Sequence, residues 1–578
     1  MDLTRLFGTD KPPRRGEVLR RGEAQVTLEA GQLRHLRIGG TEAIRAVSFL
    51  VRDRDWGTVE PVITELAMKG GHVAYVARYD MGGGSLDAQV TLTLTPDSLT
   101  AEVVAVAQGT VETNRAGFTV LHPIESVAGA PVSVGHSDGS VEETRFPALV
   151  EPWQPFKDIA SLTHQTGRLR IECRLEGDVF EMEDQRQWGD ASFKTYNRPL
   201  ALPWPYAVRN GAELRQVVRI AWTPAPAAEP VAPIRAQTPD PTFPQTALVL
   251  TATDARRATA NPDDLSRIGA QRVLCHWDIA AGHGLAELRD FAALQVALPY
   301  LAHDLELIAA CPPDSDLNAE FASYAADLEA SGFRPASIMT CPSVDRQSTP
   351  PGSEWPPCPP LEAIYAAARK AFPGIPLGGG MASFFPELNR KRPPAEAWDF
   401  VTHGLCPIVH AADDLSVMET LEAVPHILAS ARVIIGKRDY RLGPSTIAMR
   451  QNPYGSRTIP NLDRDRVCMA DDDPRQDGAF AAAWTLGLAA SIALAGVTVW
   501  TPAALYGPRG LIRDDGSLRP VAAAVQAMAA QAGKAVRRAT VAHGRAELAF
   551  NTTTLAANLT PDGPDPFGWQ SFRSSHKS

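Results

Sequence analysis

Residues 168–196 read RLRIECRLEGDVFEMEDQRQWGDASFKTY, and they combine a clear strand pattern with a dense set of reactive side chains. From Arg168 to Glu176, apolar and charged residues alternate strictly, with the period of two that is typical of a half-buried antiparallel strand. Glu176-Gly177-Asp178 then predicts a tight turn into a return strand. The stretch therefore predicts an antiparallel β domain around it.

The return strand carries the chemistry of this stretch. With the same period, Glu181 and Glu183 share the face opposite Phe180 and Met182. Carboxylates, a lysine and a phenol on one face can supply an acid, a base and an anion holder. A solvated face with cross-strand ion pairs is the alternative, although the interleaved aromatic residues favour a groove. The candidates from this block are Glu183, Asp184, Lys194 and Tyr196.

The first 223 residues continue the β pattern outward from this block. Short alternating runs at 25–30, 33–38, 44–51, 73–79 and 90–107 are bounded by Gly and turn residues, with no long helical period among them. Residues 1–223 are therefore predicted to form a β-sandwich. His122 lies within it, either as a functional base or as a core histidine.

A Pro-rich linker at 224–245 separates this domain from a region with a different period. From 246 to 533, eight apolar runs alternate with helical stretches, which predicts a (β/α)8 TIM-type barrel. A doubly wound open sheet is the alternative, but the first βα turn lacks GxGxxG. Residues 534–578 are predicted to form a small C-terminal β unit whose end, 561–578, frays. The eight runs are 246–250, 272–275, 305–310, 336–339, 375–377, 400–408, 440–447 and 497–500.

Polar residues at the carboxyl ends of these strands are the barrel's functional candidates, because that face carries the active site in such barrels. Two pairs, His276-x-Asp278 and His410-x-x-Asp413, raise a metal site, but the HxH and HExxH spacings are missing and no metal is predicted. Arg475 and Arg509 are candidate anion holders, or surface ion pairs. The substrate-binding candidates are Asp278, Asn389, Arg390, His410 and Asp413, and Glu387 is a catalytic candidate.

Length and composition exclude several classes of protein. At 578 residues the chain needs more than one domain. Its net charge of -10 offers no field for nucleic acid. Seven scattered cysteines and no signal-like start predict a reducing, cytoplasmic location. Residues 479–500 carry no charge, but their Ala and Gly content predicts a buried helix plus strand rather than a membrane span. No cofactor motif is present, and the oligomeric state is not predicted.

Several motifs together resemble the bacterial D-apionate lactonase family, over nearly the whole chain. The family implies hydrolysis of D-apionolactone to D-apionate in the breakdown of D-apiose. The motifs are Gly117-Phe118 with Leu121-His122-Pro123, Gln154-Pro155-Phe156, the block from Glu181 to Tyr196, Glu387-Leu388-Asn389-Arg390 with Arg392-Pro393, Val409-His410-Ala411-Ala412-Asp413-Asp414, and Gly507-Pro508-Arg509-Gly510.

Three hypotheses follow. In a sugar-acid lactonase, Glu387, Glu183 and Asp184 are the acid and base candidates, and Lys194 or Arg390 would hold the oxyanion. For Glu183, Asp184 and Lys194 to act with Glu387, the block from Glu181 to Tyr196 must lie over the carboxyl end of the barrel. In a glycoside hydrolase, Glu387 would pair with Glu354 or Asp413 across one glycosidic bond. A non-catalytic carbohydrate-binding protein is the third hypothesis.

Overall fold

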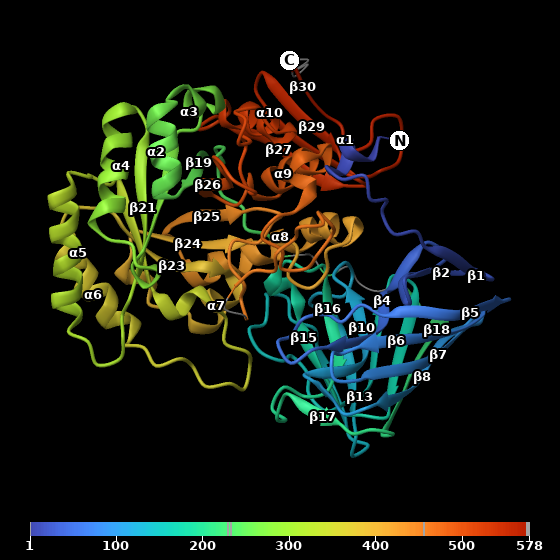
Figure 1. Ribbon diagram of the computed structural model, residues 1–578. Helices are drawn as coiled ribbons and strands as arrows, with labels where there is room; N and C mark the ends of the chain where they lie inside the picture. Colours follow the sequence, from blue (N-terminus) through green and yellow to red (C-terminus); the bar gives the residue numbers. More distant parts are fainter. Residues whose placement is uncertain (1, 228–230, 232–233, 455–456, 574–578) are drawn as a thin grey trace.

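The computed structural model describes residues 2–227, 231, 234–454 and 457–573. An antiparallel β domain, a closed parallel barrel and a small four-stranded sheet follow one another along the chain (Figure 1). The predicted fold class is therefore confirmed.

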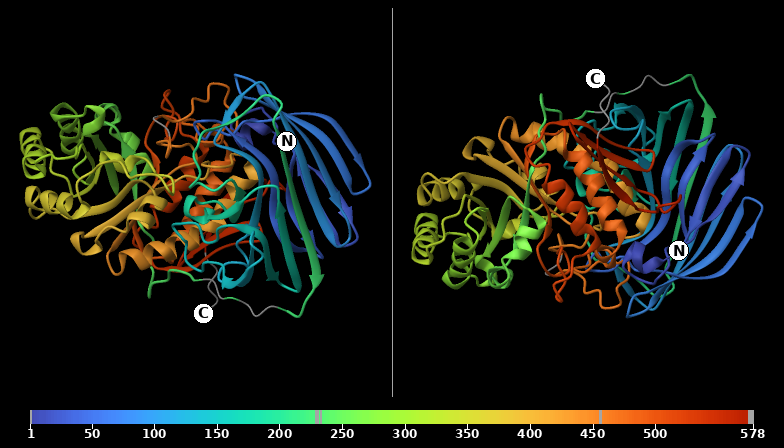
Figure 2. Two further views of the ribbon diagram at one scale, coloured as in Figure 1. Left: turned by 90° about the horizontal axis from the view of Figure 1, so that it is seen from below. Right: turned by 90° about the horizontal axis from the view of Figure 1, so that it is seen from above.

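The N-terminal domain is one long antiparallel sheet that folds over on itself. Its strands follow the order β1-β2-β3-β4-β10-β16-β15-β13-β14-β18-β8-β7-β6-β5, with β11 and β12 beside β13. Strands far apart in this order nevertheless contact each other, β4 with β13 and β10 with β18. Two layers thus enclose the apolar core (Figure 2). The strands are β1 (Glu17–Arg21), β2 (Ala24–Glu29), β3 (Gln32–Ile38), β4 (Thr41–Arg52), β5 (Val62–Lys69), β6 (His72–Asp80), β7 (Ser85–Leu94), β8 (Ser98–Gln108), β10 (Arg115–Pro123), β11 (Pro131–His136), β12 (Val141–Arg145), β13 (Ile159–Thr166), β14 (Leu169–Glu176), β15 (Phe180–Asp184), β16 (Ser192–Asn197) and β18 (Glu213–Pro224), while β9 (Val111–Thr113) pairs with β17 (Tyr206–Val208).

The predicted return strand exists, but it does not return beside its predecessor. β13 lies between β14 and β15, and β15 pairs with β16. The predicted face is confirmed, because Glu181 lies opposite Tyr196 and Glu183 opposite Lys194. The solvated alternative is wrong, since Glu181 is 3% exposed and Lys194 is 5% exposed. The barrel and the loops around β15 cover this face.

The barrel closes with eight parallel strands, and each of the eight predicted runs overlaps one of them. At β23 the predicted run ended at 377, whereas the strand continues through Gly378, Gly379 and Gly380. The aromatic rings of Trp398 and Phe400 fill the space of the missing side chains, since a Cβ on either Gly378 or Gly379 would lie 2.0 Å from a ring carbon. The barrel strands are β19 (Gln245–Leu250), β20 (Arg272–Asp278), β21 (Ala302–Ala309), β22 (Ser337–Pro342), β23 (Leu377–Phe384), β24 (Phe400–Leu405), β25 (Asp439–Ser445) and β26 (Val497–Ala504).

Helices follow the barrel strands and surround them (Figure 1). The uncharged run at 479–500 is a buried helix followed by a buried strand, as predicted. Among the described residues, no helix is long and apolar enough to cross a membrane. The helices are α2 (Ala252–Ala260), α3 (Asp263–Ile268), α4 (Leu285–Ala297), α5 (Leu317–Ser331), α6 (Leu361–Ala371), α7 (Phe385–Lys391), α8 (Asp414–Ile435), α9 (Ala479–Ile492) and α10 (Pro520–Ala529), with 3-10 turns η1 (Gln185–Trp188), η2 (Ile279–Ala281), η3 (Ser343–Arg346), η4 (Ala395–Ala397) and η5 (Pro474–Asp477).

The first helix and the C-terminal sheet both pack against α9 of the barrel. The first helix, α1 (Leu3–Phe7), places the Phe7 ring 6.2 Å from Phe480 of α9 and 5.5 Å from Phe567. The C-terminal sheet is β27 (Val536–Ala542), β28 (Arg545–Phe550), β29 (Thr553–Asn558) and β30 (Trp569–Arg573). The prediction that the segment 561–578 frays is wrong for β30, because this strand pairs with β29. Residues 574–578 of that segment lie outside the described residues.

Candidate active site

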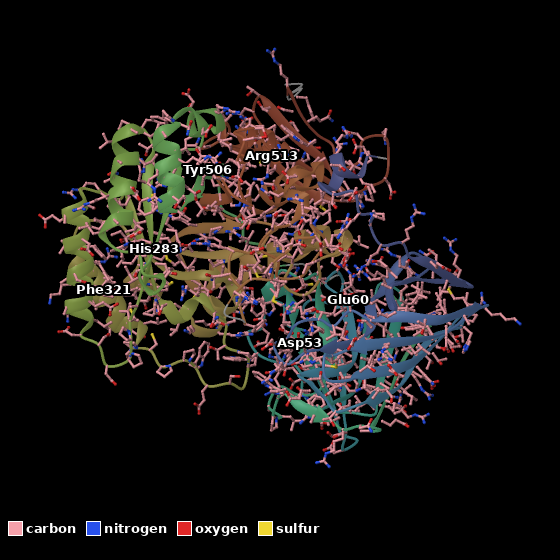
Figure 3. The ribbon with its side chains drawn as sticks, in the orientation of Figure 1. Asp53, Glu60, His283, Phe321, Tyr506 and Arg513 are labelled. Carbon is pink, nitrogen blue, oxygen red and sulfur yellow. The ribbon has the colours of Figure 1, made fainter. Side chains whose placement is uncertain are left out.

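A cavity of about 730 Å³ opens at the carboxyl ends of the barrel strands. This volume falls within the usual range of ligand pockets. Figure 3 places Tyr506, one of its lining residues, on the barrel and well away from Asp53 and Glu60 on the sandwich. A second space of about 30 Å³ lies inside the barrel and is too small for a sugar. The polar residues that line the larger cavity are Thr251, Asp254, His276, Asp278, Ser343, Arg346, Gln347, Thr446, Arg450, Gln451, Asn452, Arg457, Thr458, Tyr506 and Arg509.

His276, Glu306 and Arg450 meet at one wall of this cavity. His276 on β20 and Glu306 on β21 are register partners, and His276 Nδ1 lies 2.8 Å from Glu306 Oε1. Arg450, in the loop after β25, donates Nη1 to Glu306 Oε2 at 3.0 Å. Its Nη2 lies 2.8 Å from His276 Nδ1 and also contacts Glu306 Oε1. Among the described residues, His276 Nε2 has no hydrogen-bond partner, and the side chain is 21% exposed.

Burial and charge set the protonation of this group. Burial alone would raise the pKa of Glu306, but Arg450 and His276 hold it well below its ordinary value. Burial and the Arg450 charge lower the pKa of His276, against the opposing effect of Glu306. At neutral pH the arrangement is therefore a carboxylate, an uncharged imidazole and a guanidinium. An uncharged imidazole with one nitrogen free can act as a general base.

Of the ten predicted catalytic and substrate-binding residues, Asp278 alone lines the cavity, as far as the described residues extend, while His276 and Arg509, which the sequence raised for a metal and for an anion, line it as well. Its Oδ2 accepts a 2.6 Å hydrogen bond from Arg346 Nη1, and its Oδ1 caps η2 through the Ala281 amide at 3.1 Å. Asp254 is similarly engaged, since it forms a capping box with Thr251 at the start of α2. Both carboxylates therefore hold the cavity wall in shape.

Six of the predicted residues lie together elsewhere, in what we call the interdomain cluster. Glu183 Oε2 lies 2.7 Å from Lys194 Nζ, and Glu183 Oε1 accepts from Trp188 Nε1 at 3.1 Å. The Trp188 ring packs edge-on against His410 at 5.8 Å and lies tilted against Tyr454 at 5.3 Å. The cluster comprises Glu183, Trp188, Asp190, Lys194, Tyr196, Glu387, Arg390, His410 and Tyr454.

Each carboxylate of the interdomain cluster is paired with a Lys, Arg or His side chain of the cluster. His410 Nδ1 lies 2.7 Å from Asp190 Oδ2. Burial would raise the pKa of Glu183, but Lys194 and its neighbours hold it well below the ordinary value. Burial also lowers the pKa of Lys194, despite the nearby carboxylate. The Tyr196 hydroxyl donates to Glu181 at 2.5 Å, and burial raises the pKa of Tyr196 well above its ordinary value. The cluster is therefore an enclosed ion-pair network.

Glu387 and Arg390 on α7 join the interdomain cluster to the wall of the cavity. Arg390 Nη1 donates to Glu387 Oε1 at 3.2 Å and to the Thr349 carbonyl at 3.1 Å. Burial raises the pKa of Glu387, although Arg390 opposes the change. The segment that carries Thr349 also carries Arg346 and Gln347, which line the cavity. A second segment, the loop after β25, also connects the cluster to the cavity. It carries Tyr454 of the cluster and, a few residues earlier, Arg450 of the cavity wall.

The remaining predicted residues lie where the two domains meet, and Asn389 and Asp413 bond directly across the contact. Asp184 pairs with Arg186, and neither side chain is exposed. Asn389 Nδ2 donates to the Val150 carbonyl of the sandwich at 3.0 Å. Asp413 caps α8 through the Ser416 amide at 2.9 Å and accepts from Arg34 of β3 at 3.1 Å.

Two other candidates from the sequence, His122 and Arg475, are buried in the protein core. His122 is fully buried next to His164 and Phe146, and burial lowers the pKa of His122 to about 3. Arg475 is buried against Asp473 and Asp414, whereas Arg509 lines the cavity. No group of three or more His, Cys, Asp or Glu residues in the described parts of the chain is arranged to hold a metal ion.

Sequence reasoning missed Glu306 and Arg450. Glu306 carried a readable signal, because it interrupts the apolar run 305–310, and a carboxylate inside a barrel strand must be paired or functional. It also occupies the fifth position of its strand, as His276 does on the neighbouring strand. Arg450 lies in an irregular loop whose path across the barrel mouth depends on tertiary packing, so no local pattern points to it.

Comparisons with known proteins point to the same family over both large domains of the chain. Residues 4–225 match the family described as D-apionate lactonase, N-terminal domain, and residues 246–533 match D-apionate lactonase, TIM barrel domain. A protein of Brucella anthropi named D-apionate lactonase is 45% identical over 550 residues, which cover 92% of this chain and 90% of that protein.

Two solved structures resemble the chain more weakly. A β-glucuronidase from Ruminococcus gnavus has a TM-score of 0.33 and 10% identity, over 76% of this chain and 67% of its own. An α-galactosidase from Lactobacillus brevis has a TM-score of 0.29 and 8% identity, over 94% of this chain and 89% of its own. At such TM-scores neither structure bears on the function.

The two-domain fold, the polar cavity at the barrel mouth and these matches define a lactonase, a carboxylic ester hydrolase. The chain belongs to the D-apionate lactonase family.

Proposed function

We propose that this enzyme hydrolyses D-apionolactone to D-apionate and that the reaction takes place in the barrel cavity. The observation that carries the proposal is the His276–Glu306–Arg450 group, which presents an uncharged imidazole to a cavity of ligand size. Family membership supports the choice of a lactone, and the name of the Brucella anthropi relative supports D-apionolactone.

In the first step, His276 activates water. Glu306 Oε1, which can only accept, and Arg450 Nη2, which can only donate, both lie 2.8 Å from His276 Nδ1. Because Arg450 Nη2 also donates to Glu306 Oε1, we assign the Nδ1 proton to the hydrogen bond with Glu306, and this leaves the Nε2 lone pair facing the cavity. Nε2 takes a proton from water while the water oxygen bonds to the lactone carbonyl carbon. The carbonyl oxygen becomes an oxyanion, which the positive charges of Arg346 and Arg450 at the cavity wall stabilise.

In the second step, the tetrahedral intermediate collapses. The bond between the carbonyl carbon and the ring oxygen breaks, and the departing oxygen takes the proton back from His276 Nε2. One water has then been added across one ester bond, and the hydroxy acid ionises to a carboxylate in solution. Glu306 never touches the substrate. It is a positioning residue that holds the ring and its tautomer, while Arg450 keeps Glu306 ionised.

The assay mixes purified protein with D-apionolactone and follows acid release against the spontaneous rate. We expect release well above background, and a His276→Asn protein gives the matched blank. A rate equal to the spontaneous one would remove the proposal. Binding of D-apionate without turnover of any lactone in a panel of five- and six-carbon sugar lactones would favour a carbohydrate-binding protein instead.

Glu306→Gln should lower kcat by about 10- to 100-fold and move the acid limb of the kcat/KM profile to lower pH. The active form is the uncharged imidazole, and the Glu306 carboxylate raises the pKa of His276. Without that charge the pKa of His276 falls further, so the imidazole stays uncharged at lower pH. The measurement is a pH series of initial rates for both proteins. An unchanged limb, or one displaced upward, would mean that Glu306 does not position His276.

Glu183 and Lys194 stay in the proposal in a restricted role. We propose that the interdomain cluster supports the cavity wall through the segments that carry Tyr454 and Thr349, because no contact of the described residues brings Glu183 or Lys194 into the cavity lining. Direct participation in the reaction is the competing role that the sequence predicted. Substitution of Glu183 and Lys194 distinguishes the supporting role from the direct one.

Glu183→Gln and Lys194→Met should each destabilise the protein by about 3 to 5 kcal/mol, because each leaves its buried partner charge unpaired. The kcat of the folded fraction should stay within about tenfold of the wild-type value. The measurements are thermal melting and kcat at a temperature well below the midpoint. Arg174→Met, which removes an exposed charge elsewhere on the same sheet, is the control. A loss of kcat on the order of 100-fold with unchanged melting would place the pair in the reaction itself.

The glycoside hydrolase alternative is not favoured. Glu387 is paired with Arg390, Asp413 caps α8, and Glu354 is exposed, so these carboxylates do not flank a common space in the cavity lining. The cavity carboxylates, Asp254 and Asp278, are committed to a helix cap and to Arg346. An acid and nucleophile pair is therefore not assembled among the described residues.

We propose that the enzyme is located in the cytoplasm. Its proposed substrate is a small sugar-acid lactone. All seven cysteines are free thiols, as expected in a reducing compartment. The net charge of -10 disfavours nucleic acid.

A further inference from the structure

Arg509 differs from the other half-buried arginines of the cavity in having no carboxylate partner. Arg346 is paired with Asp278, and Arg450 is paired with Glu306. Arg509 Nη1 donates to the carbonyl oxygens of Met449 and Asp471, both at 3.2 Å. Within the described residues, its Nε and Nη2 make no hydrogen bond and no acidic side chain lies within ion-pair distance. A guanidinium that lines a cavity with free donors is suited to an anion.

The surroundings of Arg509 leave its positive charge only partly compensated. Burial and repulsion from Arg450 both lower the pKa of Arg509. The backbone holds it firmly, since the turn that carries it places Arg509 next to β26, where Ala504 N donates to the Arg509 carbonyl at 3.0 Å. The two carbonyl bonds fix one edge of the guanidinium. The other edge remains available at the mouth of the barrel.

We infer that Arg509 recognises the carboxylate of the ring-opened sugar acid, so that the cavity selects aldonates over neutral sugars of the same skeleton. The inference rests on the proposed function, because ring opening turns the lactone carbonyl into that carboxylate. A bidentate contact between guanidinium and carboxylate needs two donors on one edge, and Nε with Nη2 provides them. The neutral lactone offers a weaker acceptor at the same place, so Arg509 affects the product more than the substrate.

The experiment is calorimetric titration of the protein with D-apionate and with D-apiitol, the polyol that lacks the carboxylate. Arg509→Gln should raise the Kd of D-apionate by about 10- to 100-fold, the effect of losing hydrogen bonds to a charged group. The Kd of D-apiitol should change less than about twofold. Arg509→Lys should restore part of the affinity, since it keeps the charge but not the fork. In kinetics, Arg509→Gln should weaken product inhibition by D-apionate while KM for the lactone changes less than about threefold.

Arg457→Gln is the matched control, because Arg457 also lines the cavity but is exposed. At physiological salt its effect on D-apionate should stay under about threefold. Equal loss of D-apionate and D-apiitol in Arg509→Gln would overturn the inference, since it would mean that Arg509 only tethers the carbonyls of Met449 and Asp471. An unchanged Kd for D-apionate would overturn it as well.

Two further outcomes separate this inference from the proposed function. Selective, Arg509-dependent binding of D-apionate by a protein that turns over no lactone would support anion recognition and remove the lactonase proposal. Should Arg509→Gln fail to fold, the wild-type protein decides: a Kd for D-apionate at least about tenfold below that for D-apiitol supports the inference, and equal values overturn it.

Discussion

Replacing His276 with Asn should lower kcat for lactone hydrolysis by about 10²- to 10⁴-fold, the usual contribution of a positioned general base. Asn retains an amide that can donate to Glu306, so the neighbouring ion pair with Arg450 keeps its geometry. The melting temperature should therefore change little. Stopped assays over hours, with the spontaneous rate subtracted, measure the residual activity.

His283→Asn is the control for this experiment. Its ring lies 5.8 Å from that of His276, but His283 is outside the cavity lining and its Nδ1 accepts from the Asp278 amide. We expect its kcat to stay within about fivefold of the wild-type value. If His276→Asn kept more than about a tenth of the activity, the base would have to be sought elsewhere, and Glu183 and Glu387 of the interdomain cluster would be the next residues to test.

Local pattern was sufficient to predict the barrel. Each buried strand is a short apolar run between helical stretches, and this signal survives in β19, β20 and β26 because neighbouring residues alone produce it. The pattern failed at β23, where three glycines resemble a turn. Their strand conformation depends on the rings of Trp398 and Phe400, which come from a later part of the chain.

The candidate site was harder to predict, for a physical reason. The face that carries Glu183 and Lys194 was read correctly from the period of two, but the period cannot tell whether water or another domain covers that face. Here Trp188 and the two segments after β22 and β25 cover it, so a group that resembles an active site by composition is an enclosed network. Glu306, by contrast, was missed because the apolar run around it was interpreted only as a barrel strand, although its carboxylate interrupts that run.

Replacing Arg186 with Met should destabilise the protein by about 3 to 5 kcal/mol, as much as Glu183→Gln or Lys194→Met in the same block. Arg186 is fully buried and donates to both oxygens of Asp184 at 2.8 and 2.7 Å. It also donates to the carbonyls of Pro147, Ala148 and Leu149, which fix a loop of the sandwich. Met fills much of the space but leaves Asp184 as an unpaired buried charge.

Arg186 also couples the two domains, which makes the outcome measurable. Its Nη1 donates to His426 Nδ1 of α8 at 2.9 Å, and burial with the Arg186 charge lowers the pKa of His426 to about 3, so His426 accepts as an uncharged ring. Urea unfolding followed by tryptophan fluorescence should detect the loss, since Trp188 lies two residues away. Arg170→Met, at an exposed position on β14, should change stability by no more than about 0.5 kcal/mol.

The double variant Asp184→Asn with Arg186→Met tests the mechanism of this stabilisation. Removing both charges leaves no uncompensated ion in the interior, so the double variant should be more stable than Arg186→Met alone, although it loses one more partner. If the double variant were instead as unstable as the sum of the two single variants, the pairing would not be the cause. The three carbonyls and His426 that lose their donor would then account for the whole effect, and the block would serve mainly to anchor the loop at 147–149 against α8.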